Sequence, residues 1–175
     1  FAFQATHCAA YGRFCSARGV TPQRVTHWRE IPPVPAGAFK ELALRSFPAE
    51  RTRHVFRTSG TSGARRGELP LDTLALYEAS LLPSFVRFVL PEAMARLAGD
   101  TRVAAVSPSS SFALRVLAPS PDEAPDSSLS HMFGVLLREL RERDIVSPAA
   151  SGFDVRNGVL EVAALGRALA HAADD

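Results

Sequence analysis

The chain has 175 residues, of which 46% are hydrophobic and 22% are charged, and its formal net charge is +2 at pH 7. These values are typical of a globular protein with one sizeable core, so we expect a single domain over residues 1–175. A small net charge without a basic block or an aromatic-interleaved stripe argues against nucleic acid as the main partner. The sequence has no apolar run near 18 residues and no secretory signal, which predicts a cytoplasmic protein without a membrane span.

The first predicted element is a helix. Residues 2–18 carry apolar and aromatic side chains at spacings of three and four, which predicts one amphipathic helix that ends at Gly19. Cys8 and Cys15 would lie two turns apart on this helix, roughly 10 Å along its axis. Because that separation is too long for a disulfide within a regular helix, reduced and partly buried thiols are expected. The two cysteines do not indicate a metal site.

A proline-rich stretch and a short helix come next. Three of the four positions from Pro32 to Pro35 are proline, which excludes a helix and predicts an extended segment. Residues 36–44 then have a helical composition. Lys40, the only lysine among the 20 basic residues, falls on this predicted helix and is expected at the surface.

The most distinctive segment, residues 55–67, reads V-F-R-T-S-G-T-S-G-A-R-R-G. Residues 54–57 and 67–71 are predicted as strands, so the loop between them is the tip of a hairpin. Every residue from Thr58 to Gly63 is Thr, Ser or Gly, and such a loop offers backbone N–H groups and hydroxyls to an anion. Positive charge flanks the loop at Arg57, Arg65 and Arg66.

Two interpretations of this loop are open at this point. It can hold the phosphates of a nucleotide, or it can be a flexible Gly/Ser connection, and its composition alone favours neither. It differs from a P-loop, because a strand rather than a helix follows it and the pattern G-x-x-x-x-G-K-[ST] is absent.

The remainder of the chain predicts helices interspersed with short strands. The helices are expected over residues 73–82, 83–91, 92–98, 128–142 and 159–172, and the strands over residues 102–106, 113–118 and 145–146. Residues 119–125 are expected as an exposed loop, and Asn157-Gly158 indicates a turn. Asp126 or Ser127 is the expected cap of helix 128–142. The inward face of that helix is predicted to contain Leu129, Met132, Phe133, Leu136, Leu137 and Leu140. This order predicts an α/β fold with helices layered on a mixed sheet.

Three segments in order along the chain carry a family resemblance. They are W-R-E-I-P-P-V-P-A-G-A-F-K at residues 28–40, F-R-T-S-G-T-S-G at residues 56–63 and D-S-S-L-S-H-M-F at residues 126–133. Together they resemble the acyl-protein synthetase (LuxE-like) family of adenylate-forming enzymes. The resemblance covers most of the chain and implies the N-terminal portion of the large domain of those enzymes.

This resemblance implies a two-step reaction. A carboxylic acid, typically a long-chain fatty acid, attacks the α-phosphate of ATP and gives acyl-adenylate and pyrophosphate, with Mg²⁺ sharing the phosphate charge. The acyl group then passes to a thiol of an acceptor protein. One alternative is an aryl- or acyl-CoA ligase of the phenylacetate-CoA ligase type. Another is a non-catalytic, partner-binding module that retains the fold, which the four loop hydroxyls and the flanking arginines disfavour.

The resemblance also assigns roles to residues. The residues expected to bind the β- and γ-phosphates are Thr58, Ser59, Gly60, Thr61, Ser62 and Gly63. Arg66 stands where related loops carry a basic residue and is expected to contact the triphosphate, the other interpretation being a solvated arginine. His131 lies in a segment similar to one that lines the acyl pocket, although a helical histidine is more often an ordinary, partly buried residue. No residue of this chain is identified as catalytic.

Several motifs of complete family members have no counterpart in this chain. These are an acidic ATP/Mg²⁺ motif, ribose contacts, an acyl-accepting cysteine and a mobile C-terminal portion with a catalytic basic residue. We therefore expect residues 1–175 to be a fragment that binds nucleotide weakly and shows negligible carboxylate-dependent pyrophosphate exchange. Robust incorporation of labelled pyrophosphate into ATP by the purified chain would contradict this expectation.

Overall fold

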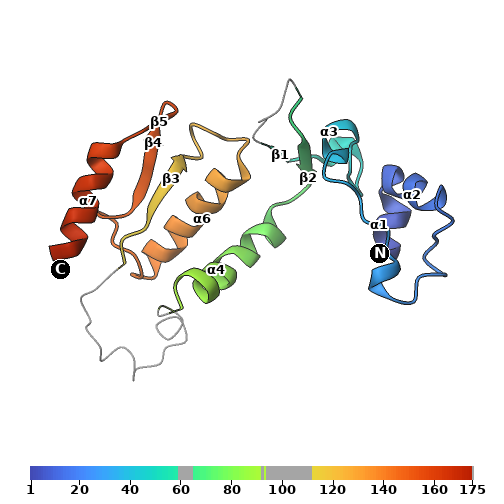
Figure 1. Cartoon of the computed structure of the whole chain (residues 1–175), viewed down its shortest axis with the longest axis horizontal. Helices are drawn as coiled ribbons and strands as arrows, with labels where there is room; N and C mark the ends of the chain where they lie inside the picture. The colour runs from blue at the N-terminus through green and yellow to red at the C-terminus, as the bar shows by residue number, and fades with distance from the viewer. Residues whose placement is uncertain (59–64, 92, 94–111, 175) are drawn as a thin grey trace. The chain divides into compact units, whose positions relative to one another are not determined.

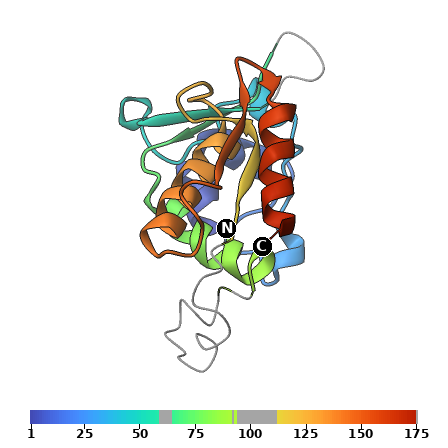
Figure 2. The same cartoon turned by 90° about the vertical axis from the view of Figure 1, so that its left-hand side faces the viewer.

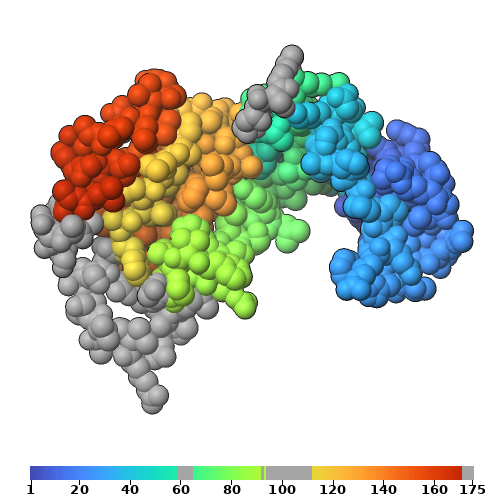
Figure 3. All heavy atoms as spheres, in the orientation of Figure 1, coloured from blue at the N-terminus to red at the C-terminus, as the bar shows by residue number. Residues whose placement is uncertain are grey.

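The computed structural model describes residues 1–58, 65–91, 93 and 112–174 (Figures 1 and 3). The chain divides into two compact units, Phe1–Leu74 and Ala75–Asp175. The single domain over residues 1–175 stays a prediction. Among the described residues, none of the helices has both the length and the apolar character needed to cross a bilayer. The predicted helix 92–98 and strand 102–106 fall wholly or mostly outside the described residues.

The first unit begins with two helices, α1 (Ala2–His7) and α2 (Ala9–Ser16), so the prediction of one continuous helix was wrong. The break lies at Cys8, whose φ of −95° and ψ of 96° are extended. It brings Gly12 against α1, where a Cβ atom would lie 2.6 Å from the Ala5 carbonyl oxygen. Only a glycine allows this approach, which the spacing of apolar residues does not reveal. Both Cys8 and Cys15 are buried, more deeply than expected.

A tyrosine on α2 fixes the proline-rich stretch. The Tyr11 hydroxyl donates a hydrogen bond to the Pro32 carbonyl at 3.0 Å. Burial, together with a hydrogen bond and charge interaction with Cys15, raises the pKa of Tyr11 to about 12. Tyr11 is therefore a protonated donor at neutral pH, and it ties α2 to a segment 21 residues away.

The rest of the first unit is a short helix beside a hairpin. The segment includes the 3-10 turns η1 (Trp28–Glu30) and η2 (Ala49–Arg51) and the helix α3 (Ala38–Glu41), which is shorter than the predicted helix 36–44. Strands β1 (His54–Arg57) and β2 (Glu68–Leu71) pair antiparallel, with Val55 opposite Pro70 and Arg57 opposite Glu68. Both predicted strands and the hairpin are thus confirmed, to within one residue.

The second unit is a mixed three-stranded sheet with helices on its two sides (Figures 1 and 2). Strand β3 (Arg115–Pro119) runs parallel to β4 (Gly152–Arg156), and β4 runs antiparallel to β5 (Val159–Leu160). Helix α6 (Ser128–Glu142) contacts β3, and α7 (Val162–Asp174) contacts β4. The chain is therefore mixed α/β, as predicted.

Helix α6 supplies more buried apolar side chains to the core of this unit than any other described element, and its predicted bounds are confirmed. Ser127 is its cap, since the Ser127 hydroxyl accepts a hydrogen bond from the Ser130 N–H at 3.2 Å. Its buried apolar side chains are Val135, Leu136, Leu137 and Leu140. The prediction that Leu129 points inward was wrong, because this side chain is 51% exposed, while Val135 is buried instead.

Helix α4 (Ala75–Val89) packs against α6 and runs continuously through Pro83, where the sequence predicted the start or a kink of a second helical piece. A proline inside a helix removes one backbone hydrogen bond. Leu81 and Val86, on either side of Pro83, are both buried in the same core cluster as Leu136 and Leu140. The helix is thus held by tertiary packing on both sides of the proline.

Strands β4 and β5 were not predicted. The Asp154 carboxylate on β4 is 1% exposed and forms a bidentate ion pair with the Arg115 guanidinium on β3, so a charged residue occupies the one buried position of this strand. The predicted turn at Asn157-Gly158 is confirmed, with φ of 50° and 75°, and it joins β4 to β5. The predicted helix 159–172 was wrong at its start, because Val159 and Leu160 complete this hairpin before α7 begins.

The predicted strand 145–146 forms a single isolated β-bridge, between Val146 and Phe112.

Two leucines of α6 test this description of the core. Leu136 is fully buried, so Leu136→Ala should lower the free energy of unfolding by about 2–5 kcal/mol through lost burial and a cavity. Leu129→Ala, the same substitution on the same helix, should cost less than about 1 kcal/mol because Leu129 is half exposed. Thermal unfolding followed by circular dichroism measures both, and equal losses would contradict the assigned orientation of α6.

Candidate functional site

The candidate site lies where the hairpin of the first unit closes toward its tip. Thr58 follows β1 directly, and Gly67 precedes β2. The Thr58 N–H donates to the Gly67 carbonyl at 2.9 Å, and the Gly67 N–H donates to the Thr58 hydroxyl, also at 2.9 Å. We call this pair of residues the neck of the hairpin. It joins the two ends of the eight-residue connection, residues 59–66.

Arg66 reinforces the neck. Its Nε–H donates to the Thr58 carbonyl at 2.7 Å, and its Nη2 lies 3.5 Å from the Arg57 carbonyl oxygen. The structure thus brings together Thr58 and Arg66, the two predicted phosphate contacts that it describes. The other predicted members, Ser59, Gly60, Thr61, Ser62 and Gly63, lie outside the described residues.

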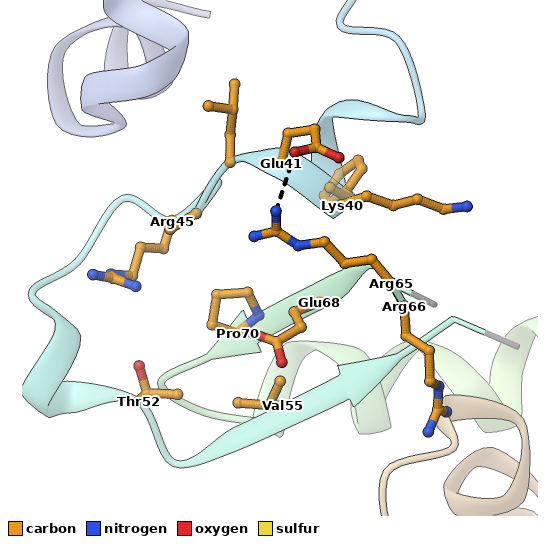
Figure 4. A pocket seen from close by; sticks show the side chains of 12 residues that line it. Lys40, Glu41, Arg45, Thr52, Val55, Arg65, Arg66, Glu68 and Pro70 are labelled. Carbon is orange, nitrogen blue, oxygen red and sulfur yellow. Dashed lines mark hydrogen bonds and ion pairs between the residues drawn. The ribbon is translucent and has the colours of Figure 1, made fainter. Parts of the chain in front are cut away.

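A hollow of about 350 Å³ lies between α3 and the hairpin (Figure 4). Its charged lining residues are Lys40, Glu41, Arg45, Arg65, Arg66 and Glu68. The two carboxylates are paired, Glu41 with Arg65 and Glu68 with Arg57, each at 3.1 Å. Lys40 and Arg45 form no ion pair within the described part of the chain and point to opposite sides of the hollow (Figure 4). The hollow therefore has an excess of positive charge.

The sequence pattern predicts that Lys40 lies at the surface. It gives no sign that Lys40, Glu41 and Arg45 lie beside the hairpin. The one available signal was that Lys40 is the only lysine in an arginine-rich chain. Its position opposite the hairpin depends on the packing of α3 against β2, which are far apart in the sequence. Such contacts are not encoded in the local pattern of either segment.

His131 belongs to the second unit, on α6. Its Nε2 lies 2.8 Å from Oε1 of Glu78 on α4, and its ring centre is 6.2 Å from that of Tyr77. Burial raises the pKa of the Tyr77 phenol, whose hydroxyl donates to the Ser128 carbonyl at 2.9 Å. Glu78, but not His131, is among the residues that line a groove of about 410 Å³ along α4 and α6. In this unit His131 links two helices, and its role in an acyl pocket stays a prediction.

Neither unit holds a ready-made metal centre within the residues described. No group of three or more His, Cys, Asp or Glu side chains there is arranged to hold a metal ion. The ion pairs Arg57–Glu68 and Arg65–Glu41 are exposed, and such pairs contribute little to stability individually.

Comparisons with protein family models, with curated proteins and with solved structures find no match to this chain.

The neck can be tested with two glycines of the same unit. A Cβ atom at Gly67 would lie 3.2 Å from Cγ2 and 3.3 Å from Oγ1 of Thr58. The Thr58 side chain is itself held in place by the hydrogen bond that its hydroxyl accepts from the Gly67 N–H. Gly67→Ala should therefore lower the free energy of unfolding by about 1 kcal/mol or more. A Cβ atom at Gly37, which has a helical φ of −60°, would meet nothing within 4 Å.

Gly37→Ala is thus the matched control, expected to be neutral or stabilising by up to about 1 kcal/mol. Urea unfolding followed by circular dichroism compares the two variants. If Gly67→Ala is as stable as Gly37→Ala, the neck is not a tight contact.

Proposed function

We propose that this chain is part of an adenylate-forming enzyme that activates a carboxylic acid, typically a long-chain fatty acid, with ATP. The observation that carries the proposal is the closed hairpin, whose strands are joined through the sequence T-S-G-T-S-G at residues 58–63 and which has a basic hollow beside it. Glycines and hydroxyls supply donors for phosphate oxygens, and arginine and lysine supply charge. The resemblance to acyl-protein synthetases adds the type of reaction and the fold of the large domain.

In this proposal the loop binds the β- and γ-phosphates of ATP. Its donors are the hydroxyls of Ser59, Thr61 and Ser62 and the backbone N–H groups around Gly60 and Gly63. A carboxylate oxygen attacks the α-phosphorus while the bond to the pyrophosphate oxygen breaks. Donors fixed on the leaving pyrophosphate stabilise the charge that develops there. Mg²⁺ would enter as Mg–ATP, bound to the phosphates.

The second step follows from the chemistry of the acyl-adenylate. A thiolate attacks the acyl carbonyl, a thioester forms, and AMP leaves with the electron pair of the broken bond. The resemblance favours a thiol of an acceptor protein, with CoA as the alternative thiol. His131, through the groove that Glu78 lines, is the proposed link to the acyl chain. We propose a cytoplasmic enzyme, since both ATP and reduced thiols are available there.

Calorimetric titration with Mg–ATP tests the phosphate assignment. Ser59→Ala/Thr61→Ala removes two proposed hydroxyl donors, and because hydrogen bonds to charged groups are the stronger ones, affinity should fall at least about tenfold. Ser84→Ala, an exposed serine on α4, is the matched control and should bind like the wild type. Equal affinities of the double variant and the wild-type chain would remove the phosphate-loop assignment.

A further inference from the structure

Two adjacent arginines leave the hairpin in opposite directions. Figure 4 shows Arg65 reaching across the hollow to Glu41 on α3, while Arg66 turns away from α3. Sequence reasoning singled out Arg66 as the phosphate contact. The contacts of the two side chains instead indicate that they have different roles.

Arg66 is engaged with the hairpin backbone. Its guanidinium donates to the carbonyl of Thr58 at 2.7 Å and reaches that of Arg57 at 3.5 Å, at the end of β1. Thr58 is in turn bonded to Gly67 through its N–H and its hydroxyl. A phosphate that recruited Arg66 would have to break these contacts, and the neck would lose its cross-link. A hydrogen bond from a charged guanidinium to a backbone carbonyl is stronger than one between two neutral groups.

Arg65 is held much more weakly. Its partner among the described residues is Glu41, at 3.1 Å, and the two side chains are 68% and 67% exposed. Exposed ion pairs of this kind are worth about 0–1 kcal/mol. A phosphate group carries more negative charge than a carboxylate and matches the guanidinium fork, so it can displace Glu41 at little cost.

We propose that Arg66 is a positioning residue that locks the neck before any ligand binds, and that Arg65 exchanges Glu41 for a phosphate group of the nucleotide. The first part stands on the hairpin alone, and the second part rests on the proposed function. Glu41 then acts as a competing anion that lowers affinity for phosphate. This predicts a gain of binding when the Glu41 charge is removed.

Hydrogen exchange in the ligand-free protein tests the locking role. The probes are the Thr58 and Gly67 amides, both bonded across the neck. Arg66→Gln should speed their exchange about fivefold or more, since it removes the guanidinium that braces the Thr58 carbonyl. Arg65→Gln, the neighbouring control, should leave their exchange unchanged. Equal exchange in Arg66→Gln and the wild type would overturn this role.

A Mg–ATP titration followed by NMR of the arginine Nε–H groups tests the exchange role. The Arg65 resonance should shift on binding, and that of Arg66 should stay in place. Arg65→Gln should weaken binding about three- to tenfold, and Glu41→Gln should strengthen it about two- to fivefold. A shift of Arg66 instead of Arg65 would overturn the proposal while leaving the proposed function intact. If the wild-type chain does not bind Mg–ATP, both the proposed function and the role of Arg65 are overturned. The locking role of Arg66 is then still tested by hydrogen exchange of the Thr58 and Gly67 amides.

Discussion

A two-stranded hairpin is marginal in water by itself, so the closure between Thr58 and Gly67 is the constraint on which the candidate site depends. Two hydrogen bonds cross the neck, one through a backbone carbonyl and one through a hydroxyl. Arg66 also donates to the carbonyl of Thr58, the residue that directly follows β1. The connection beyond the neck therefore starts and ends at a fixed separation. Backbone donors are effective only when they are pre-positioned, so the proposed anion site depends on this closure.

The elements that were predicted almost to the residue are those whose ends carry local sequence signals. Helix α6 has a serine cap and an apolar face, and a Ser/Thr/Gly sequence separates β1 from β2, so each was found almost to the residue. The Asn157-Gly158 turn needs positive φ at both positions, which these residue types tolerate best. Strand β4 was missed for the opposite reason. Its Asp154 is buried only because Arg115, 39 residues earlier, neutralises it.

The same distinction between local sequence signals and tertiary contacts applies to the candidate site. The sequence identifies a loop rich in hydroxyls with arginines beside it, because that signal is composition. It cannot tell which of two adjacent arginines faces α3, since this depends on the contacts of Arg66 with Thr58 and of Arg65 with Glu41 in the folded unit. Nor does it show that Glu41 pairs with Arg65, because α3 and β2 meet only in the folded unit. Tertiary contacts decided both questions.

The hydroxyl of Thr58 also bears on the choice between a phosphate site and a structural loop. A purely structural hairpin needs an acceptor for the Gly67 N–H, and Thr58 supplies it. One of the four hydroxyls is therefore explained by the neck alone. Ser59, Thr61 and Ser62 carry the other three hydroxyls of the segment. Since serine and threonine at a turn are useful mainly as hydrogen-bonding groups, these three residues carry the argument for an anionic ligand, and Thr58 does not.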